Sequence, residues 1–156
     1  MLNVSGEESK LLYSGIQKEG IYNPEGIGLQ EMPGESEAPE EIIAKSTEDQ
    51  INLGKQLYSR TCFACHQAEG QGILGAFPPL ANSDYLNQDV NRAIDVVIRG
   101  KSGEITVNGV NYNSVMTQQV LTDEEVANVL TYVYSSWGNS EKIVTSDMVK
   151  KVRNLK

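Results

Sequence analysis

The chain has 156 residues, 39% of them hydrophobic and 22% charged, and a formal net charge of −8 at pH 7. This length allows one domain with appended segments rather than two separate cores. The negative charge argues against nucleic acids and anionic membrane surfaces as partners, and no stretch approaches the roughly 18 apolar residues of a membrane span. We therefore expect neither nucleic-acid binding nor membrane insertion.

The first segment, residues 1–46, is an acidic leader with nine acidic and three basic residues, and it is rich in Gly, Pro, Glu and Ser. This composition is typical of a tether that cannot bury enough apolar surface to fold alone. Its few apolar side chains, such as Leu11, Tyr13 and Ile21, suit an alternative in which the leader docks on a partner domain. Its start lacks the basic-then-apolar pattern of a secretory signal. We expect either that a signal has been removed or that the chain is a piece of a longer protein.

The next segment predicts a helix that begins at Thr47 and delivers Cys62 at its end. Thr47 is a plausible N-cap, and Glu48 with Asp49 places acids in the first turn. Apolar or small residues recur at three- and four-residue spacing along one face: Ile51, Gly54, Leu57 and Tyr58. A glycine inside a helix costs roughly 1 kcal/mol against alanine. Gly54 therefore indicates a close helix crossing.

A C-x-x-C-H motif comes next, Cys62-Phe63-Ala64-Cys65-His66, and it holds both cysteines and the only histidine of the chain. This pattern is typical of covalent haem c attachment. The two thiols can each add across a porphyrin vinyl group, and His66 then brings an imidazole to the iron. We expect one covalent haem c, bound by Cys62 and Cys65, with His66 as a metal ligand.

Other uses of the motif meet obstacles. A structural zinc site needs four ligands, usually from paired Cys/His clusters, and the sequence has no second cluster. A thioredoxin-type redox pair requires a neighbouring strand–helix–strand pattern, and the sequence shows none near the motif. A disulfide between Cys62 and Cys65 stays possible, although it would close a very small loop.

Residues 70–80 form a turn-rich loop with two prolines. Proline carbonyls can accept a hydrogen bond from the imidazole of His66, which would orient the ring and raise its basicity. The loop can equally serve to pack Phe77 and Leu80, and the two roles are compatible.

Residues 89–99 predict a helix with Ala93, Val96 and Val97 on one face and Gly100 as its stop. In residues 105–112, an Asn108-Gly109 pair between alternating apolar residues predicts a β-hairpin.

Thr122 and Glu125 form a capping box ahead of an apolar run. The apolar face of this core helix comprises Val126, Val129, Leu130, Val133 and Trp137, and we expect the helix to end at Gly138. The tail, residues 141–156, holds two acidic and five basic residues. A cap signal at Ser146 and bases near the end predict a short helix there.

The second axial position of the iron decides between carrier and catalyst. Of the four methionines, Met1 is terminal, Met32 lies in the leader and Met148 lies in the tail. Met116 lies after the hairpin in a loop from which its thioether can reach the haem face opposite His66, although a buried methionine can also be plain core filling. Thioether ligation favours ferrous iron and leaves no open site for substrate. We expect His66/Met116 ligation, one-electron transfer and no catalytic residues, whereas an open or Lys- or Tyr-ligated iron would indicate peroxidase-like or sensor chemistry.

Arg60 and Arg99 are candidates to pair with the haem propionates, and their alternative role is a solvated surface charge. Tyr132 and Trp137 are expected to pack rather than to relay electrons.

Taken together, residues 47–140 resemble the class I (mitochondrial-type) cytochromes c. The resemblance is carried by the Gly54/Tyr58 helix, the Cys62–His66 motif, Pro78-Pro79-Leu80, Met116 and the Val129/Tyr132 helix. It implies a mainly α fold, three to five helices around a covalent haem, here with a small β-hairpin and an extended N-terminal leader. It further implies that Gly54 packs against Val129 and Tyr132, and that the Pro78 carbonyl accepts the bond from His66. Thr117 departs from the pattern, because many relatives carry proline after the methionine.

A narrower resemblance covers more of the chain. Residues 123–133 and Ser135-Ser136-Trp137-Gly138-Asn139 look like the C-terminal haem c domain of three-domain copper nitrite reductases. The tail 144–153 is similar to the C-terminal end of that domain, and Tyr13-Ser14-Gly15 with Ile21-Tyr22-Asn23-Pro24 is similar to the tether before it.

This second resemblance implies a parent enzyme that reduces nitrite to NO at copper ligands absent from this chain. The haem would then accept electrons from a soluble donor and deliver them to a type 1 copper in the periplasm. Two alternatives stay open: a free-standing periplasmic shuttle, and a cytochrome subunit of a dehydrogenase or oxidase.

Overall fold

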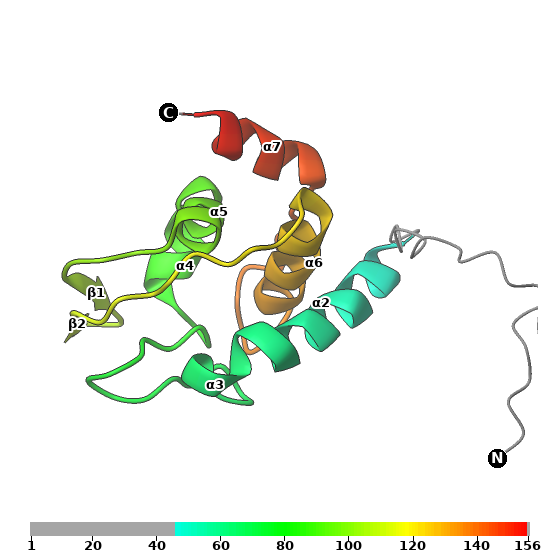
Figure 1. Cartoon of the computed structure of the whole chain (residues 1–156). Helices are drawn as coiled ribbons and strands as arrows, with labels where there is room; N and C mark the ends of the chain where they lie inside the picture. The colour runs from blue at the N-terminus through cyan, green and yellow to red at the C-terminus, as the bar shows by residue number, and fades with distance from the viewer. Residues whose placement is uncertain (1–45, 156) are drawn as a thin grey trace, which may run out of the picture. The chain divides into compact units, whose positions relative to one another are not determined.

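The computed structural model describes residues 46–155, so the leader lies outside the described residues. The elements in chain order are α2 (Thr47–Thr61), α3 (Phe63–His66), α4 (Asp84–Gln88), α5 (Val90–Arg99), β1 (Ile105–Val107), β2 (Val110–Tyr112), α6 (Asp123–Tyr134) and α7 (Ser146–Asn154) (Figure 1). The expected mainly helical fold with one small hairpin is confirmed. Among these residues, no helix is both long and apolar enough to cross a membrane.

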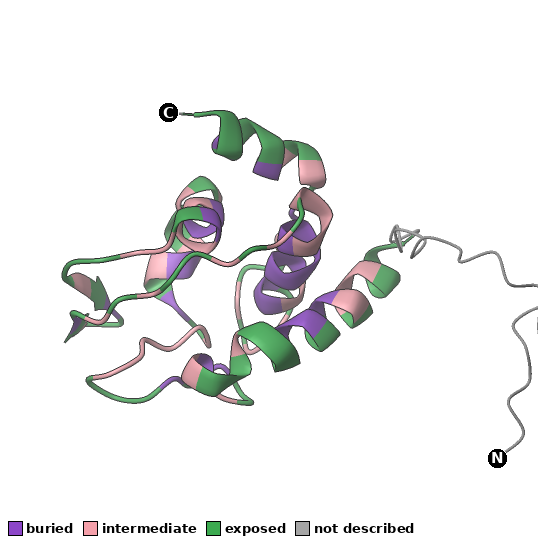
Figure 2. Cartoon of the chain, in the orientation of Figure 1, coloured by how far each residue is buried: buried purple, intermediate pink, exposed green. Residues whose placement is uncertain are grey.

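Helices α2 and α6 cross at Gly54, as the glycine indicates (Figure 1). A Cβ atom built at Gly54 would lie 2.7 Å from the Asn128 carbonyl carbon and 2.7 Å from Cβ of Tyr132. Tyr132 is the expected neighbour. Val129, the other neighbour expected, lines a cavity described below. Buried residues run along most of α6, which makes it the central helix of the core (Figure 2).

Helix caps lie close to where the sequence indicates them. The Thr122/Glu125 capping box at the start of α6 is confirmed, with backbone-to-side-chain bonds of 3.2 and 2.8 Å. The caps of α2 and α7 are Ser46 and Thr145, each one residue before the one expected. Both have extended backbone and a side chain that accepts from the amide three residues on, which is the geometry of an N-cap.

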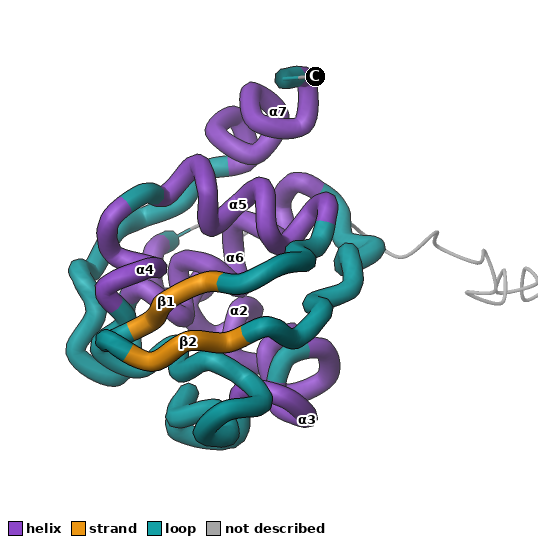
Figure 3. The backbone as a smooth tube through the Cα atoms, turned by 90° about the vertical axis from the view of Figure 1, so that its left-hand side faces the viewer, coloured by secondary structure: helices purple, strands orange, loops and turns teal. Residues whose placement is uncertain are grey.

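The expected hairpin is confirmed, and Figure 3 shows β1 and β2 side by side. Ile105 lies opposite Tyr112 and Val107 opposite Val110. Asn108 and Gly109 take φ values of 51° and 79°, as a two-residue turn between right-twisted strands requires. Val107 and Tyr112 are buried, so one face of the hairpin joins the interior.

The end of α6 differs from expectation. The helix stops at Tyr134, and Trp137 and Gly138 come after it with φ values of 51° and 74°. Trp137 therefore leaves the helical face and packs against Tyr58 in a tilted arrangement and against Tyr132 edge to face, with ring centroids 5.2 and 5.5 Å away. The role expected for Tyr132 and Trp137, packing, fits these contacts.

The tail folds over the core through α7. Val149 and Val152 are buried, together with Val144 in the segment before the helix. Helix α7 contacts both α5 and α6, and residues of these two helices also line the cavity into which Val129 points. The tail therefore packs against α5 and α6, the two helices that form walls of that cavity.

Candidate functional site

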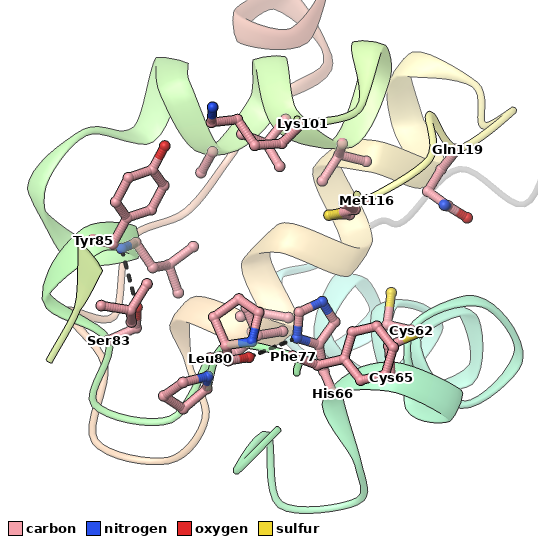
Figure 4. A pocket seen from close by; sticks show the side chains of 18 of the residues that line it. Cys62, Cys65, His66, Phe77, Leu80, Ser83, Tyr85, Lys101, Met116 and Gln119 are labelled. Carbon is pink, nitrogen blue, oxygen red and sulfur yellow. Dashed lines mark hydrogen bonds between the residues drawn. The ribbon is translucent and has the colours of Figure 1, made fainter. Parts of the chain in front are cut away.

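A cavity of about 380 Å³ lies between α5, α6, the hairpin and the loops after α3 and β2. Its walls are mostly apolar, and the side chains of Cys62, Cys65, His66 and Met116 all reach it (Figure 4). The structure thus gathers both thiols, the single imidazole and one thioether around one space.

His66 is held in the cavity wall by its own backbone and by a proline. Its amide donates to the Cys62 carbonyl at 2.9 Å in the short helix α3, and the ring Nδ1 lies 3.0 Å from the Pro78 carbonyl oxygen. Because a carbonyl can only accept, Nδ1 carries the proton and Nε2 keeps its lone pair for a metal. Burial lowers the pKa of His66, and the Pro78 bond opposes this in part. The ring is therefore a neutral imidazole, as a metal ligand must be.

Gly72 allows Pro78 to reach the histidine. A Cβ atom there would lie 2.7 Å from the Pro78 carbonyl oxygen and would also meet the carbonyl of Phe77, and its φ is +64°. The amide of Gly72 donates to the His66 carbonyl at 3.0 Å. The loop therefore folds tightly against His66, which a side chain at position 72 would prevent.

Both cysteines are free thiols on the cavity wall, so the pair is not joined by a disulfide. Burial raises the pKa of Cys62, and the nearby Cys65 adds to this, while a hydrogen bond with Thr61 acts the other way. The end of α2 and the three-residue spacing present both sulfurs to the same space.

Met116 faces His66 from the opposite wall (Figure 4). Its backbone pairs with Lys101 in both directions, at 2.8 and 2.9 Å, and the Gln119 amide donates to the Val97 carbonyl at 2.9 Å. The Ser114 hydroxyl donates to the Ala76 carbonyl. The methionine loop is thereby tied to α5 on one side and to the proline loop on the other.

Arg99, expected at the haem propionates, is not among the residues that line the cavity. Its guanidinium pairs with Asp95 and donates to the carbonyls of Val152, Arg153 and Leu155 at the end of α7. It lies near a helix C-terminus, where cations are favoured. Arg60 is exposed on α2 and is also outside the cavity.

Sequence reasoning missed Lys101 and Tyr85, which line the cavity at the end away from the cysteines (Figure 4). The sequence signal that could have indicated Lys101 is Gly100, because the chain changes direction after a glycine that ends a helix. Val96 and Val97, expected on the apolar face of this helix, also line the cavity.

The donor set fits a covalent haem. Two thiols stand at one end, a neutral imidazole and a thioether face each other, the walls are apolar, and a cation lies at the far end. A helical fold with α2 crossed on α6, around a cavity that carries a C-x-x-C-H motif, defines a c-type cytochrome domain.

Comparison with known proteins agrees with this class. Residues 51–137 match the family model described as cytochrome c. Cytochrome c-552 of Thermus thermophilus is 41% identical over 113 residues, which cover 66% of this chain and 86% of that protein. The chain belongs to the cytochrome c family, its cofactor is covalent haem c, and its class of function is electron transfer.

Two longer relatives are cytochrome subunits. The fructose dehydrogenase cytochrome subunit of Gluconobacter japonicus is 32% identical over 117 residues, covering 70% of this chain and 24% of the subunit. The cytochrome c subunit of the quinone alcohol dehydrogenase of Gluconobacter oxydans (strain 621H) is 29% identical over 135 residues, covering 83% and 27%. The chain thus spans about a quarter of each of these subunits.

Proposed function

We propose that this domain is a one-electron carrier in which Cys62 and Cys65 hold the haem and His66 and Met116 are the axial ligands. The observation that carries the proposal is the facing pair: a neutral imidazole with a free Nε2 and a thioether on opposite walls of one apolar cavity. Haem c bound there supplies a ferrous–ferric couple. If His66 and Met116 both bind the iron, no coordination position would be left for a substrate.

The residues around the ligands support a carrier in a second way. Pro78 fixes the imidazole ring through its carbonyl, and the pairing with Lys101 holds the backbone from which the Met116 thioether extends. The apolar walls exclude water, so few groups need to reorient when the charge changes. Both features favour fast electron exchange.

As for partners, we propose a periplasmic electron shuttle of the cytochrome c-552 kind, or a cytochrome unit that serves a dehydrogenase. The similarity to cytochrome c-552 and to the two dehydrogenase subunits supports these alternatives. Attachment to a copper nitrite reductase rests only on the sequence resemblance of residues 123–139, of the tail 144–153 and of the leader motifs within residues 13–24. The genomic reading frame upstream of Met1 discriminates between these alternatives. In-frame copper ligands of a cupredoxin there would indicate attachment to a copper nitrite reductase.

The spectrum of the holoprotein tests the ligand assignment. We expect the chain, produced with haem attached, to keep its haem on a denaturing gel and to show in the ferric state the weak far-red absorption band of Met–iron ligation. We also expect no change of this spectrum when cyanide is added briefly at low concentration, because no axial position is open. Absence of the band in correctly folded protein would exclude the carrier with a His/Met iron.

Electron exchange is proposed to occur over an uncharged face beside the cavity. Residues 70–83 and 105–122 contain no Asp, Glu, Lys or Arg. Ser114 ties these two segments together through the Ala76 carbonyl, and they expose Leu74 (81%) and Val115 (68%). A partner that docks there must desolvate apolar side chains rather than pair charges.

A charge placed on this face should slow exchange. We expect Leu74→Glu to lower the electron self-exchange rate between ferrous and ferric copies by at least about tenfold, since like charges would meet in a desolvated contact. Line broadening in NMR spectra of mixed redox states measures the rate. Ile143→Glu is the matched control, because Ile143 is also exposed and apolar but lies outside the two uncharged segments, residues 70–83 and 105–122. Equal slowing in both variants would mean that net charge, and not this face, governs the encounter.

A further inference from the structure

Lys101 is the one residue with a full charge among the described residues that line the cavity. Figure 4 shows Lys101 and Tyr85 at the end of the cavity away from Cys62 and Cys65. The remaining walls are apolar or neutral. A lone cation at one end of an apolar cavity indicates which end receives a negative group.

The other cations of this region are engaged elsewhere. Arg92 donates to the Tyr85 carbonyl and stacks on the Tyr85 ring, 3.8 Å from its centroid, and Arg99 pairs with Asp95 and with the end of α7. The Lys101 ammonium donates to the Ser102 carbonyl at 2.6 Å, and no carboxylate of residues 46–155 lies within salt-bridge distance of it. Lys101 is thus the cation that a carboxylate in the cavity would meet.

The backbone of Lys101 also holds the methionine loop. Lys101 and Met116 exchange two backbone hydrogen bonds, at 2.8 and 2.9 Å. Gly100 makes this approach possible, because a Cβ atom there would lie 2.6 Å from the Met116 carbonyl oxygen, and its φ is +80°. One residue therefore connects the charged end of the cavity with the wall that carries the thioether.

A porphyrin held by its vinyl groups at Cys62 and Cys65 would turn its two carboxylates towards the opposite edge, and Lys101 lies at that end of the cavity. We propose that Lys101 is a positioning residue for electron transfer: its ammonium pairs with a haem carboxylate and raises the reduction potential, while its backbone holds Met116. This inference rests on the proposed function, since it takes haem c as the ligand and Met116 as the axial donor.

The direction of the effect is set by charge. Ferric haem carries one more positive charge than ferrous haem, so a fixed cation nearby disfavours the ferric state. An ammonium in a partly buried position is screened less by water and salt than one on the surface. Lys101 should therefore shift the redox equilibrium towards ferrous iron more than any exposed lysine does.

The test is the redox equilibrium of holoprotein variants with a fixed mediator couple. We expect Lys101→Gln to shift the ferrous–ferric ratio about tenfold towards ferric, which is about 59 mV for a one-electron couple. Lys101→Arg should stay within about twofold of the parent, because it keeps the charge. Lys150→Gln is the control: it removes the same charge from an exposed position on α7, outside the cavity, and should also stay within about twofold. Should the glutamine variant fail to assemble, Lys101→Met keeps the apolar stem and is expected to show the same shift.

The outcomes separate the two proposals. The far-red band of the parent protein reports Met116 ligation, and its absence would overturn the proposed function itself. With the band present, a shift in Lys101→Gln no larger than in Lys150→Gln would overturn the role of Lys101. An arginine variant that shifts as far as the glutamine variant would overturn it too, since charge would then not be the cause. Retention of the band in Lys101→Gln together with the tenfold shift supports the inference.

Discussion

Met116→Ala is expected to lower the reduction potential by roughly 0.2 V or more, within the range of about 0.8 V that axial ligands span. A thioether stabilises ferrous iron, and alanine offers no donor in its place. The loop around it should persist, because its ties to Lys101, Val97 and Ala76 run through backbone atoms or Ser114. Spectroelectrochemical titration measures the potential, and the far-red band should vanish.

The open position created by this change is a second readout. Small ligands such as cyanide or imidazole should bind to Met116→Ala at concentrations that leave the parent spectrum unchanged. Met148→Ala is a matched control, because Met148 packs at the edge of the core on α7 and does not line the cavity. It should keep the band and the potential while losing some stability. If Met116→Ala kept both the band and the potential, another donor would be the axial ligand.

Much of this site is encoded in local sequence signals. The Cys62–His66 motif, the Asn108-Gly109 turn and the Thr122/Glu125 capping box each act within a few residues, so tertiary packing has little power to override them. Met116 could be named by elimination among four methionines. The loop prolines could be named as acceptors for His66 from the sequence, but the choice of Pro78 required knowledge of a family, because the two residues lie twelve positions apart across a loop.

The features that were not predicted depend on the direction that the backbone takes after a helix ends. Arg99 and Lys101 are two positions apart, yet Gly100 sends one to the end of α7 and the other into the cavity. Residue type favoured the arginine as a carboxylate partner, whereas Lys101, which follows the left-handed turn at Gly100, is the cation that lines the cavity. At the end of α6, the apolar spacing continues to Trp137, but the backbone leaves the helix so that this ring can close the cluster with Tyr58 and Tyr132.

The short helix α4 was also not expected. It has five residues, too few for a periodic pattern to emerge, and it is stabilised by the Ser83 cap and by Asp84 bonding to the hairpin turn at Asn108. Elements of this kind depend on partners that are distant in sequence. They also position site residues, since Tyr85 of α4 lines the cavity.

Gly54→Ala is expected to destabilise the protein by about 1–2 kcal/mol, although helix propensity alone would predict that alanine stabilises it. Propensity alone would favour alanine by roughly 1 kcal/mol in a helix interior. The added Cβ, however, would lie 2.7 Å from two atoms of α6, the carbonyl carbon of Asn128 and Cβ of Tyr132. One of these is backbone, so the helices themselves must separate, and overpacking of this kind costs about 1–3 kcal/mol or more.

The same change should disturb the site, because α2 ends at Cys62 and α6 supplies Val129 and Val133 to the cavity wall. Urea unfolding of the holoprotein measures the loss, and the far-red band at low urea reports whether Met116 stays bound. Asn52→Ala is the matched control on the exposed side of α2, where it should be neutral or slightly stabilising. A Gly54→Ala variant as stable as Asn52→Ala would show that α2 and α6 can move apart at little cost. The close crossing of α2 and α6 would then not be required to keep His66 and Met116 in their positions.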